Sequence, residues 1–174
     1  MTQGIARLNA LSSEEAQAEL LKCCGSTNWA RRMAQQRPFP SGGDAMRRLL
    51  DSADRVWWDL GREDWLEAFT RHPRIGEKAA AKDASAETRR WSEEEQSGTR
   101  SAREQVLAAL AKANRAYEQR FGYIFIVCAT GKSSEEMLAL LQQRLQNDPA
   151  AELRMAAEEQ RRITHLRLQK LLQA

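Results

Sequence analysis

The stretch RHPRIGE, residues 71–77, contains one of only two histidines in a chain of 174 residues. His72 comes directly before Pro73, and proline disfavours the helical conformation in the residue that precedes it, which restricts the direction of the imidazole. Histidine has an ordinary pKa of about 6.5, so its ring can transfer protons near neutral pH. These residues alone leave two functions open: His72 handles a proton in a reaction, or it only shapes the loop.

A second candidate group lies about twenty residues further along, in the segment SEEEQ at residues 92–96. Ser92 lies three residues before Glu95 and four residues before Gln96. These spacings put the three side chains on one face of a helix. A hydroxyl, a carboxylate and an amide on one face can point at the same ligand.

Arg167 lies four residues after Ile163 and four residues before Leu171. It therefore projects from, or beside, the apolar stripe of the predicted last helix. An unpaired guanidinium in that position would be unfavourable. Its partner is a carboxylate, such as that of Glu95, or an anionic ligand, and the residues alone leave both alternatives open.

Other patterns favour no further site. ATGKSS resembles the end of a phosphate-binding loop, but the full motif requires a glycine five residues before Gly131, where Ile126 stands. A metal site requires clustered ligands, whereas His72 and His165 lie far apart and neither belongs to an HExxH motif. We therefore expect no metal, and we expect His165 to be a surface residue of a helix.

Composition predicts one soluble domain over residues 1–174. Hydrophobic residues make up 42% of the chain and charged residues 29%, and the 27 basic and 24 acidic residues are interspersed. The net charge of +3 is too small to indicate nucleic acid. No apolar run approaches the roughly 20 residues of a membrane span, and the last residues carry no peroxisomal signal, so we expect a cytoplasmic protein without membrane contact.

Adjacent arginines could suggest phosphate contacts, but neighbouring residues diverge by about 100° around a helix and form no common stripe. Solvated helix faces are the expected explanation. The pairs are 31–32, 47–48, 89–90 and 161–162.

Most segments repeat apolar residues at spacings of three and four, which predicts an all-α, single-domain bundle of several helices. Ser12 with Glu15, and Ser133 with Glu136, have the spacing of capping boxes, and Gly25 is suited to a left-handed helix end. The helices are expected near residues 12–24, 26–37, 44–60, 63–71, 99–120, 131–148 and 150–172. YIFIVCA, residues 123–129, is the sole β-rich run and is predicted to be a short buried extended segment.

Several of these pieces together resemble the family of 2-oxo-4-hydroxy-4-carboxy-5-ureidoimidazoline (OHCU) decarboxylases. The pieces, in order, are HPRIGE, SEEEQSG, NRAYEQRFGYIFIVCATGKS, MLALLQQRLQND with AEL, and RRITHLRLQKL. The likeness extends from about residue 8 to residue 172. It implies an all-helical homodimer that uses no cofactor and converts OHCU, an intermediate of urate breakdown, to (S)-allantoin and carbon dioxide.

The resemblance also implies the site. It places the catalytic roles on His72 and Glu95. The substrate-binding residues that it implies are Pro73, Ser92, Gln96, Ile124, Ile126 and Arg167. Loss of carbon dioxide leaves an electron pair that the conjugated ring of this substrate can hold, so no pyridoxal or thiamine is required. The alternatives are a related lyase or hydrolase of ureido compounds, and a helical module that binds nucleic acid or another partner.

Overall fold

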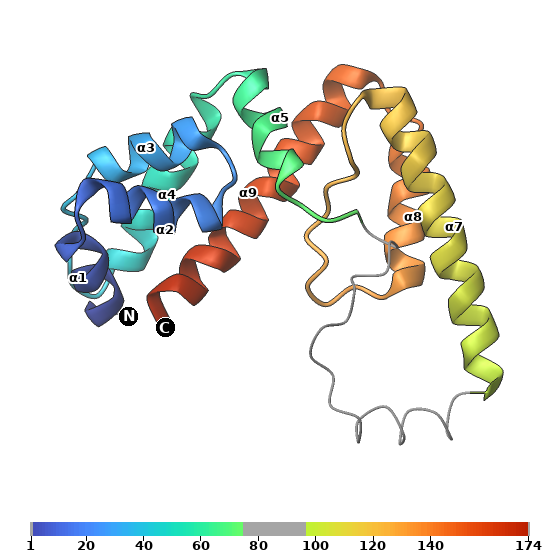
Figure 1. Ribbon diagram of the computed structural model, residues 1–174, viewed down its shortest axis with the longest axis horizontal. Helices are drawn as coiled ribbons and strands as arrows, with labels where there is room; N and C mark the ends of the chain where they lie inside the picture. The colour runs from blue at the N-terminus through green and yellow to red at the C-terminus, as the bar shows by residue number, and fades with distance from the viewer. Residues whose placement is uncertain (1, 75–96, 174) are drawn as a thin grey trace. The chain divides into compact units, whose positions relative to one another are not determined.

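The computed structural model describes residues 2–74 and 97–173, with side chains described for residues 3–74 and 104–173. Within these ranges the chain forms eight helices and no strand (Figure 1), so the all-α prediction is confirmed. The helices are α1 (Thr2–Ala10), α2 (Ser13–Cys23), α3 (Thr27–Gln35), α4 (Ala45–Trp58), α5 (Arg62–Thr70), α7 (Ser97–Phe121), α8 (Ser134–Arg144) and α9 (Pro149–Gln173).

The described residues divide into two compact units. Of the described residues, the first unit comprises 2–72 and 153–173, and the second comprises 73–74 and 97–152. Our prediction of a single domain over the whole chain stays a prediction.

Both predicted capping boxes are confirmed. In α2 the Ser12 hydroxyl accepts a hydrogen bond from the Glu15 N–H, and the Glu15 carboxylate accepts one from the Ser12 N–H. Ser133 and Glu136 make the same reciprocal pair at the start of α8. These side chains satisfy backbone donors that the first turn of a helix leaves without an intrahelical partner.

Our prediction for Gly25 is wrong in its reason. The positive-φ glycines of the described chain are Gly42, Gly122 and Gly131, whereas α2 ends through Cys24 in an extended conformation. A Cβ at Gly25 would overlap the Cβ and Cγ atoms of Arg71. Glycine is required there because the end of α5 approaches this backbone closely.

Large aromatic side chains form the core of the first unit. Trp29 of α3 and Trp57 of α4 are 0% and 2% exposed. The Trp29 indole N–H donates to the Ala53 carbonyl at 3.1 Å, and that of Trp57 donates to the Ala157 carbonyl at 3.0 Å. Each indole therefore buries a large apolar surface while its single donor is satisfied. These contacts connect α3 to α4 and α4 to α9.

The first helix, α1, was not predicted from the sequence. It lies against the end of α9. The approach is so close that a Cβ at Gly4 would overlap the backbone of Leu172. The predicted end of α8 at Pro149 is also wrong, since α8 ends at Arg144 and Pro149 begins α9. Proline is well tolerated at a first helical position, where its missing N–H is not needed.

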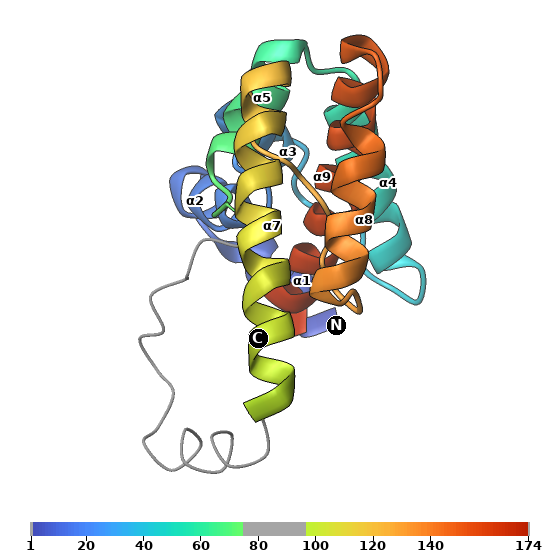
Figure 2. The same ribbon diagram turned by 90° about the vertical axis from the view of Figure 1, so that its right-hand side faces the viewer.

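In the second unit, α7 and α8 lie side by side (Figure 2). Gly122, with φ of 80°, ends α7 and starts the segment that runs to α8. The side chains of Tyr123, Phe125, Ile126 and Val127 in that segment are 2–7% exposed, and the backbone from residue 124 to 129 forms neither helix nor strand. The prediction of a buried extended connector is therefore confirmed.

Candidate functional site

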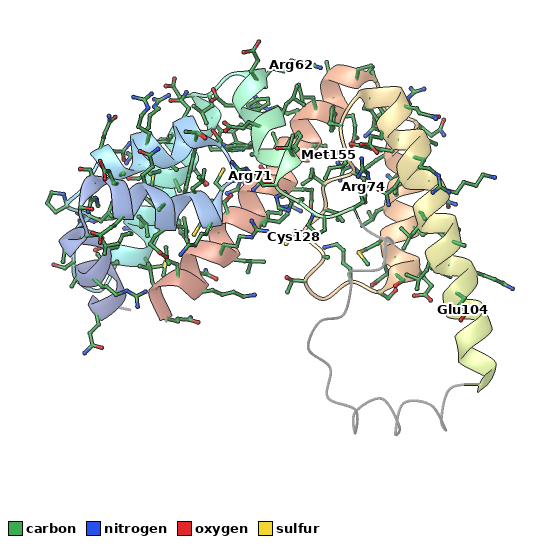
Figure 3. All side chains as sticks on the ribbon, viewed as in Figure 1. Arg62, Arg71, Arg74, Glu104, Cys128 and Met155 are labelled. Atoms are coloured by element: carbon green, nitrogen blue, oxygen red, sulfur yellow. The ribbon has the colours of Figure 1, made fainter. Side chains whose placement is uncertain are left out.

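The helix that leads to His72 is fixed at both of its ends. Glu67 in α5 accepts hydrogen bonds from the backbone N–H and the hydroxyl of Thr27, and Asp64 accepts one from the Asn28 amide at 3.3 Å. At the other end, Arg71, labelled in Figure 3, packs its aliphatic carbons over Gly25. These contacts attach α5 to the start of α3, so the residue that follows the helix has a defined position.

His72 lies directly after α5, and its backbone N–H donates to the Phe69 carbonyl at 3.2 Å. Its ring is partly buried, and Nε2 lies 2.6 Å from Oε1 of Gln160 on α9. Helix α5 therefore sets the position of the histidine backbone, and α9 sets the orientation of the ring. The predicted early end of the helix before Pro73 is confirmed, since α5 ends at Thr70.

The surroundings of His72 lower its pKa below the ordinary value. Burial is the largest cause, because removing the ring from water disfavours its charged form. The positive charge of Arg167 acts in the same direction, while the hydrogen bond with Gln160 raises the pKa and offsets part of the shift. These surroundings favour the neutral ring, the state in which an imidazole accepts a proton.

Arg167 is half-buried on α9, and its Nη1 donates to the Lys22 carbonyl at 3.3 Å. Within residues 3–74 and 104–173 no carboxylate forms an ion pair with it; Glu95, the partner considered above, lies outside the described residues. The charge of Arg167 is close enough to lower the pKa of His72. These two predicted site residues therefore interact electrostatically, and the guanidinium keeps donors for an anion.

The remaining predicted site residues lie outside the described residues or in the second unit. Ser92, Glu95 and Gln96 lie outside the described residues. Pro73 is exposed, and Ile124 and Ile126 belong to the extended segment of the second unit.

The carbonyl of Ile126 is held by a buried ion-pair network in the second unit. Arg144, 5% exposed, donates from Nη1 to the Ile126 carbonyl at 2.8 Å and from Nε to Glu152 Oε1 at 2.8 Å. Glu152 is 0% exposed and also accepts hydrogen bonds from the Tyr117 hydroxyl and from the Asn147 amide. The guanidinium of Arg144 lies 4.6 Å from the centre of the Phe125 ring. This network fixes the extended segment through the Ile126 carbonyl and the Phe125 ring.

Arg74, labelled in Figure 3, has a partner that the sequence did not indicate. Its Nε and Nη2 atoms donate to the two carboxylate oxygens of Glu118 at 3.0 and 2.7 Å. This bidentate pair attaches the chain just after His72 and Pro73 to α7 within the second unit.

His165 is paired with a carboxylate, as a structural residue would be. Its Nε2 lies 2.5 Å from Oδ1 of Asp54, and Arg161 donates to the other oxygen of the same carboxylate at 2.7 Å. The ring is held to α4 on the first unit's surface. Among residues 3–74 and 104–173, no three His, Cys, Asp or Glu side chains gather as metal ligands would, and no helix combines the length and apolar character needed to cross a membrane.

Sequence reasoning missed Gln160 and Thr164, although a signal was present. The buried stripe of α9 contains Ala156, Gln160, Thr164, Leu168 and Leu172, each four residues after the last and each at most 4% exposed. Two polar side chains on such a stripe require buried partners, which is a recognisable mark of a buried hydrogen-bond network. Ile163 and Leu171, which we placed on the apolar stripe, are only half-buried, and the fully buried stripe runs beside them.

These features define an all-α protein in which a histidine directly after α5 lies within electrostatic reach of an arginine on α9. Residues 9–169 match the model of the OHCU decarboxylase family. The chain belongs to that family.

Two relatives and one solved structure illustrate the likeness. The "Uric acid degradation bifunctional protein TTL" of Arabidopsis thaliana is 36% identical over 162 residues, which cover 92% of this chain and 48% of that protein. A "2-oxo-4-hydroxy-4-carboxy-5-ureidoimidazoline decarboxylase" of Haloferax volcanii is 30% identical over 139 residues, or 80% of this chain and 77% of that protein. The chain thus spans about half the length of the plant relative.

The solved structure is described as the "Crystal structure of OHCU decarboxylase in the presence of (S)-allantoin". It superposes with a TM-score of 0.68 at 34% identity, covering 90% of this chain and 98% of the other. The resemblance noted from the short motifs therefore extends to the fold of nearly the whole chain.

Proposed function

We propose that this chain catalyses the decarboxylation of OHCU to (S)-allantoin and carbon dioxide, a step of urate breakdown. The observation that carries this proposal is His72, held by Gln160 at 2.6 Å and within electrostatic reach of Arg167, in a chain of the OHCU decarboxylase family. Relatives named as OHCU decarboxylases, and the solved structure obtained with (S)-allantoin, support the substrate and the product.

In the proposed reaction the bond between the ring carbon and the carboxylate breaks, and its electron pair passes into the conjugated ring. The ring nitrogen that receives the pair takes up one proton, the hydroxyl group gives up its proton and becomes a carbonyl, and one proton is added to one face of the neighbouring ring carbon. We assign the proton handling near the substrate hydroxyl or carboxylate to His72. Glu95 near the departing carboxylate would destabilise that negative charge and so favour its loss. No external electron sink is needed, so we propose that the enzyme uses no cofactor.

We assign the binding of the substrate to the remaining predicted residues. The guanidinium of Arg167 offers two parallel donors to a substrate oxygen pair, and its nearness to His72 supports a shared ligand. Ser92 and Gln96 supply polar contacts. We assign further substrate contacts to Pro73 and to the backbone around Ile124 and Ile126. We further propose that the protein is a cytoplasmic homodimer.

The alternative of a nucleic-acid-binding module is less well supported. In the described chain, the arginines of three adjacent pairs are mostly engaged by carboxylates: Arg32 by Asp59, Arg47 and Arg48 by Asp44, and Arg161 and Arg162 by acidic residues of their own helix. Basic side chains that are already neutralised release few counterions from a phosphate backbone. A related lyase or hydrolase of ureido compounds would use the same His72 and Arg167.

The direct test is to follow OHCU absorbance and carbon dioxide release with the purified protein. The proposal expects consumption of OHCU and formation of (S)-allantoin without added metal or coenzyme. If OHCU decays no faster with the protein than in buffer alone, and another ureido compound is turned over, the protein is a related lyase or hydrolase and not an OHCU decarboxylase. Salt-sensitive binding of DNA with no turnover would favour the nucleic-acid module.

A further inference from the structure

The amide of Gln160 is completely buried, and both of its ends are engaged. Its Oε1 lies 2.6 Å from His72 Nε2, and its Nε2 donates to the hydroxyl of Thr164 at 3.2 Å. A buried amide without partners would be strongly unfavourable. Gln160 is therefore a fixed connection between the ring of His72 and the interior of α9.

The Thr164 hydroxyl decides which end of the amide faces the histidine. That hydroxyl has one hydrogen, and it donates to the Gln160 main-chain carbonyl at 3.0 Å. Toward the side chain of Gln160 it can then only accept, so the NH2 group must point at Thr164. The opposite orientation of the amide would require the hydroxyl to abandon the carbonyl. Gln160 consequently presents its oxygen, an acceptor, to His72.

An acceptor opposite Nε2 requires that Nε2 carries a hydrogen. We propose that Gln160 is a positioning residue that holds His72 in the Nε2–H tautomer and leaves Nδ1 as the basic nitrogen. Among the residues that the structure describes, no group forms a hydrogen bond with Nδ1. The same hydrogen bond persists when the ring takes a proton on Nδ1, since Nε2 remains a donor. The imidazole can thus change protonation state without turning.

The inference deepens the proposed function, on which its catalytic meaning rests: the proton that His72 handles is exchanged at Nδ1. Neither Gln160 nor Thr164 was among the residues implied by the family resemblance. The tautomer itself follows from hydrogen bonds of the first unit alone, so it can be measured without substrate.

The experiment is long-range proton–nitrogen NMR of the full chain labelled with 15N, recorded at a pH where His72 is neutral. The chain has two histidines, so a His72→Asn sample assigns the signals. We expect His72 to show a protonated Nε2 and an unprotonated Nδ1. Gln160→Leu should convert this pattern to the averaged signals of two exchanging tautomers. Gln160→Glu restores an acceptor, and it should restore the Nε2–H pattern while raising the pKa of His72.

Two controls separate positioning from a general structural defect. Gln169→Leu makes the same change at a half-buried position of α9, and it should leave the His72 signals unchanged. The His165 signals, which report on the separate pair with Asp54, should stay constant in every variant. If a Gln160→Leu sample does not fold, the wild-type and Gln160→Glu spectra still decide the tautomer.

A wild-type His72 with its hydrogen on Nδ1 would overturn the inference, as would an unchanged Nε2–H pattern in folded Gln160→Leu. An Nε2–H pattern in a protein that does not consume OHCU would leave this inference standing and would refute the proposed function. Turnover of OHCU by a protein whose neutral His72 carries its hydrogen on Nδ1 would overturn this inference and would support the proposed function.

Discussion

The carboxylate of Glu67 accepts two hydrogen bonds from Thr27, one from its N–H at 3.0 Å and one from its hydroxyl at 2.6 Å. Thr27 is the first residue of α3, and Glu67 lies five residues before His72. Glu67 therefore satisfies a free donor at the start of one helix and, through it, holds the end of another. The position of the proposed catalytic histidine depends on this contact between two short helices.

Glu67→Ala should lower both stability and turnover. Losing two partly exposed hydrogen bonds should destabilise the protein by about 1 kcal/mol, and freeing α5 should lower kcat because His72 loses its fixed position. Thermal unfolding and OHCU turnover measure the two effects. Glu63→Ala, an exposed change on the same helix, is the matched control. Equal turnover in both variants would show that the contact does not position His72.

The pKa of His72 should lie below its ordinary value near 6.5 and should rise when Arg167 is replaced by Gln. The unfolded state binds a proton at His72 that the folded state does not. The contribution of His72 to the free energy of unfolding is therefore fully present above about pH 6.5. It falls as the pH is lowered toward the folded-state pKa. NMR titration measures the pKa directly. A His72 pKa above the ordinary value, or one that falls in Arg167→Gln, would contradict the described environment.

Arg167→Lys should weaken substrate binding more than folding. A single ammonium cannot reproduce two parallel donors, so KM should rise roughly tenfold while the Tm changes little. Steady-state kinetics and thermal unfolding make the comparison, with Arg162→Lys on the same helix as the control. A loss of several degrees in Tm with an unchanged KM would mean that Arg167 is structural.

Arg144→Met should be strongly destabilising, because it leaves the carboxylate of Glu152 buried without its cation. The expected loss is about 3–5 kcal/mol, or roughly 10 °C in Tm. Arg115→Met, exposed on α7, should have little effect. The double variant Arg144→Met with Glu152→Gln should lose less than the sum of the single variants. Strict additivity would show that the two side chains do not form an interacting pair.

Local signals allowed much of the fold to be predicted from the sequence. Capping boxes at Ser12 and Ser133 act within one helical turn, so their spacing in the sequence is enough to locate a helix start. The end of α5 before Pro73 follows from a steric restriction between neighbouring residues. Such features depend only on residues that are close together in the sequence.

The error at Gly25 and the omission of Gln160 involve contacts between residues far apart in the chain. Gly25 is needed for the approach of Arg71, 46 positions later by the numbering, and no local rule reports that contact. The bond between His72 and Gln160 spans 88 residues. Reasoning from single-residue polarity placed Arg167 correctly beside a buried stripe, but it did not identify Gln160 and Thr164 as polar members of that stripe.

The central claim is that His72 performs chemistry, and the optical rotation of the product tests it most directly. OHCU also decays without enzyme, and protonation in free solution should give racemic allantoin. With the intact protein, the rotation of (S)-allantoin should develop as OHCU absorbance falls. His72→Asn should fold normally yet lose on the order of 10²-fold or more in turnover, with rotation near zero. Optically active allantoin formed by His72→Asn at the parent rate would contradict the claim and leave His72 a residue that only shapes its loop.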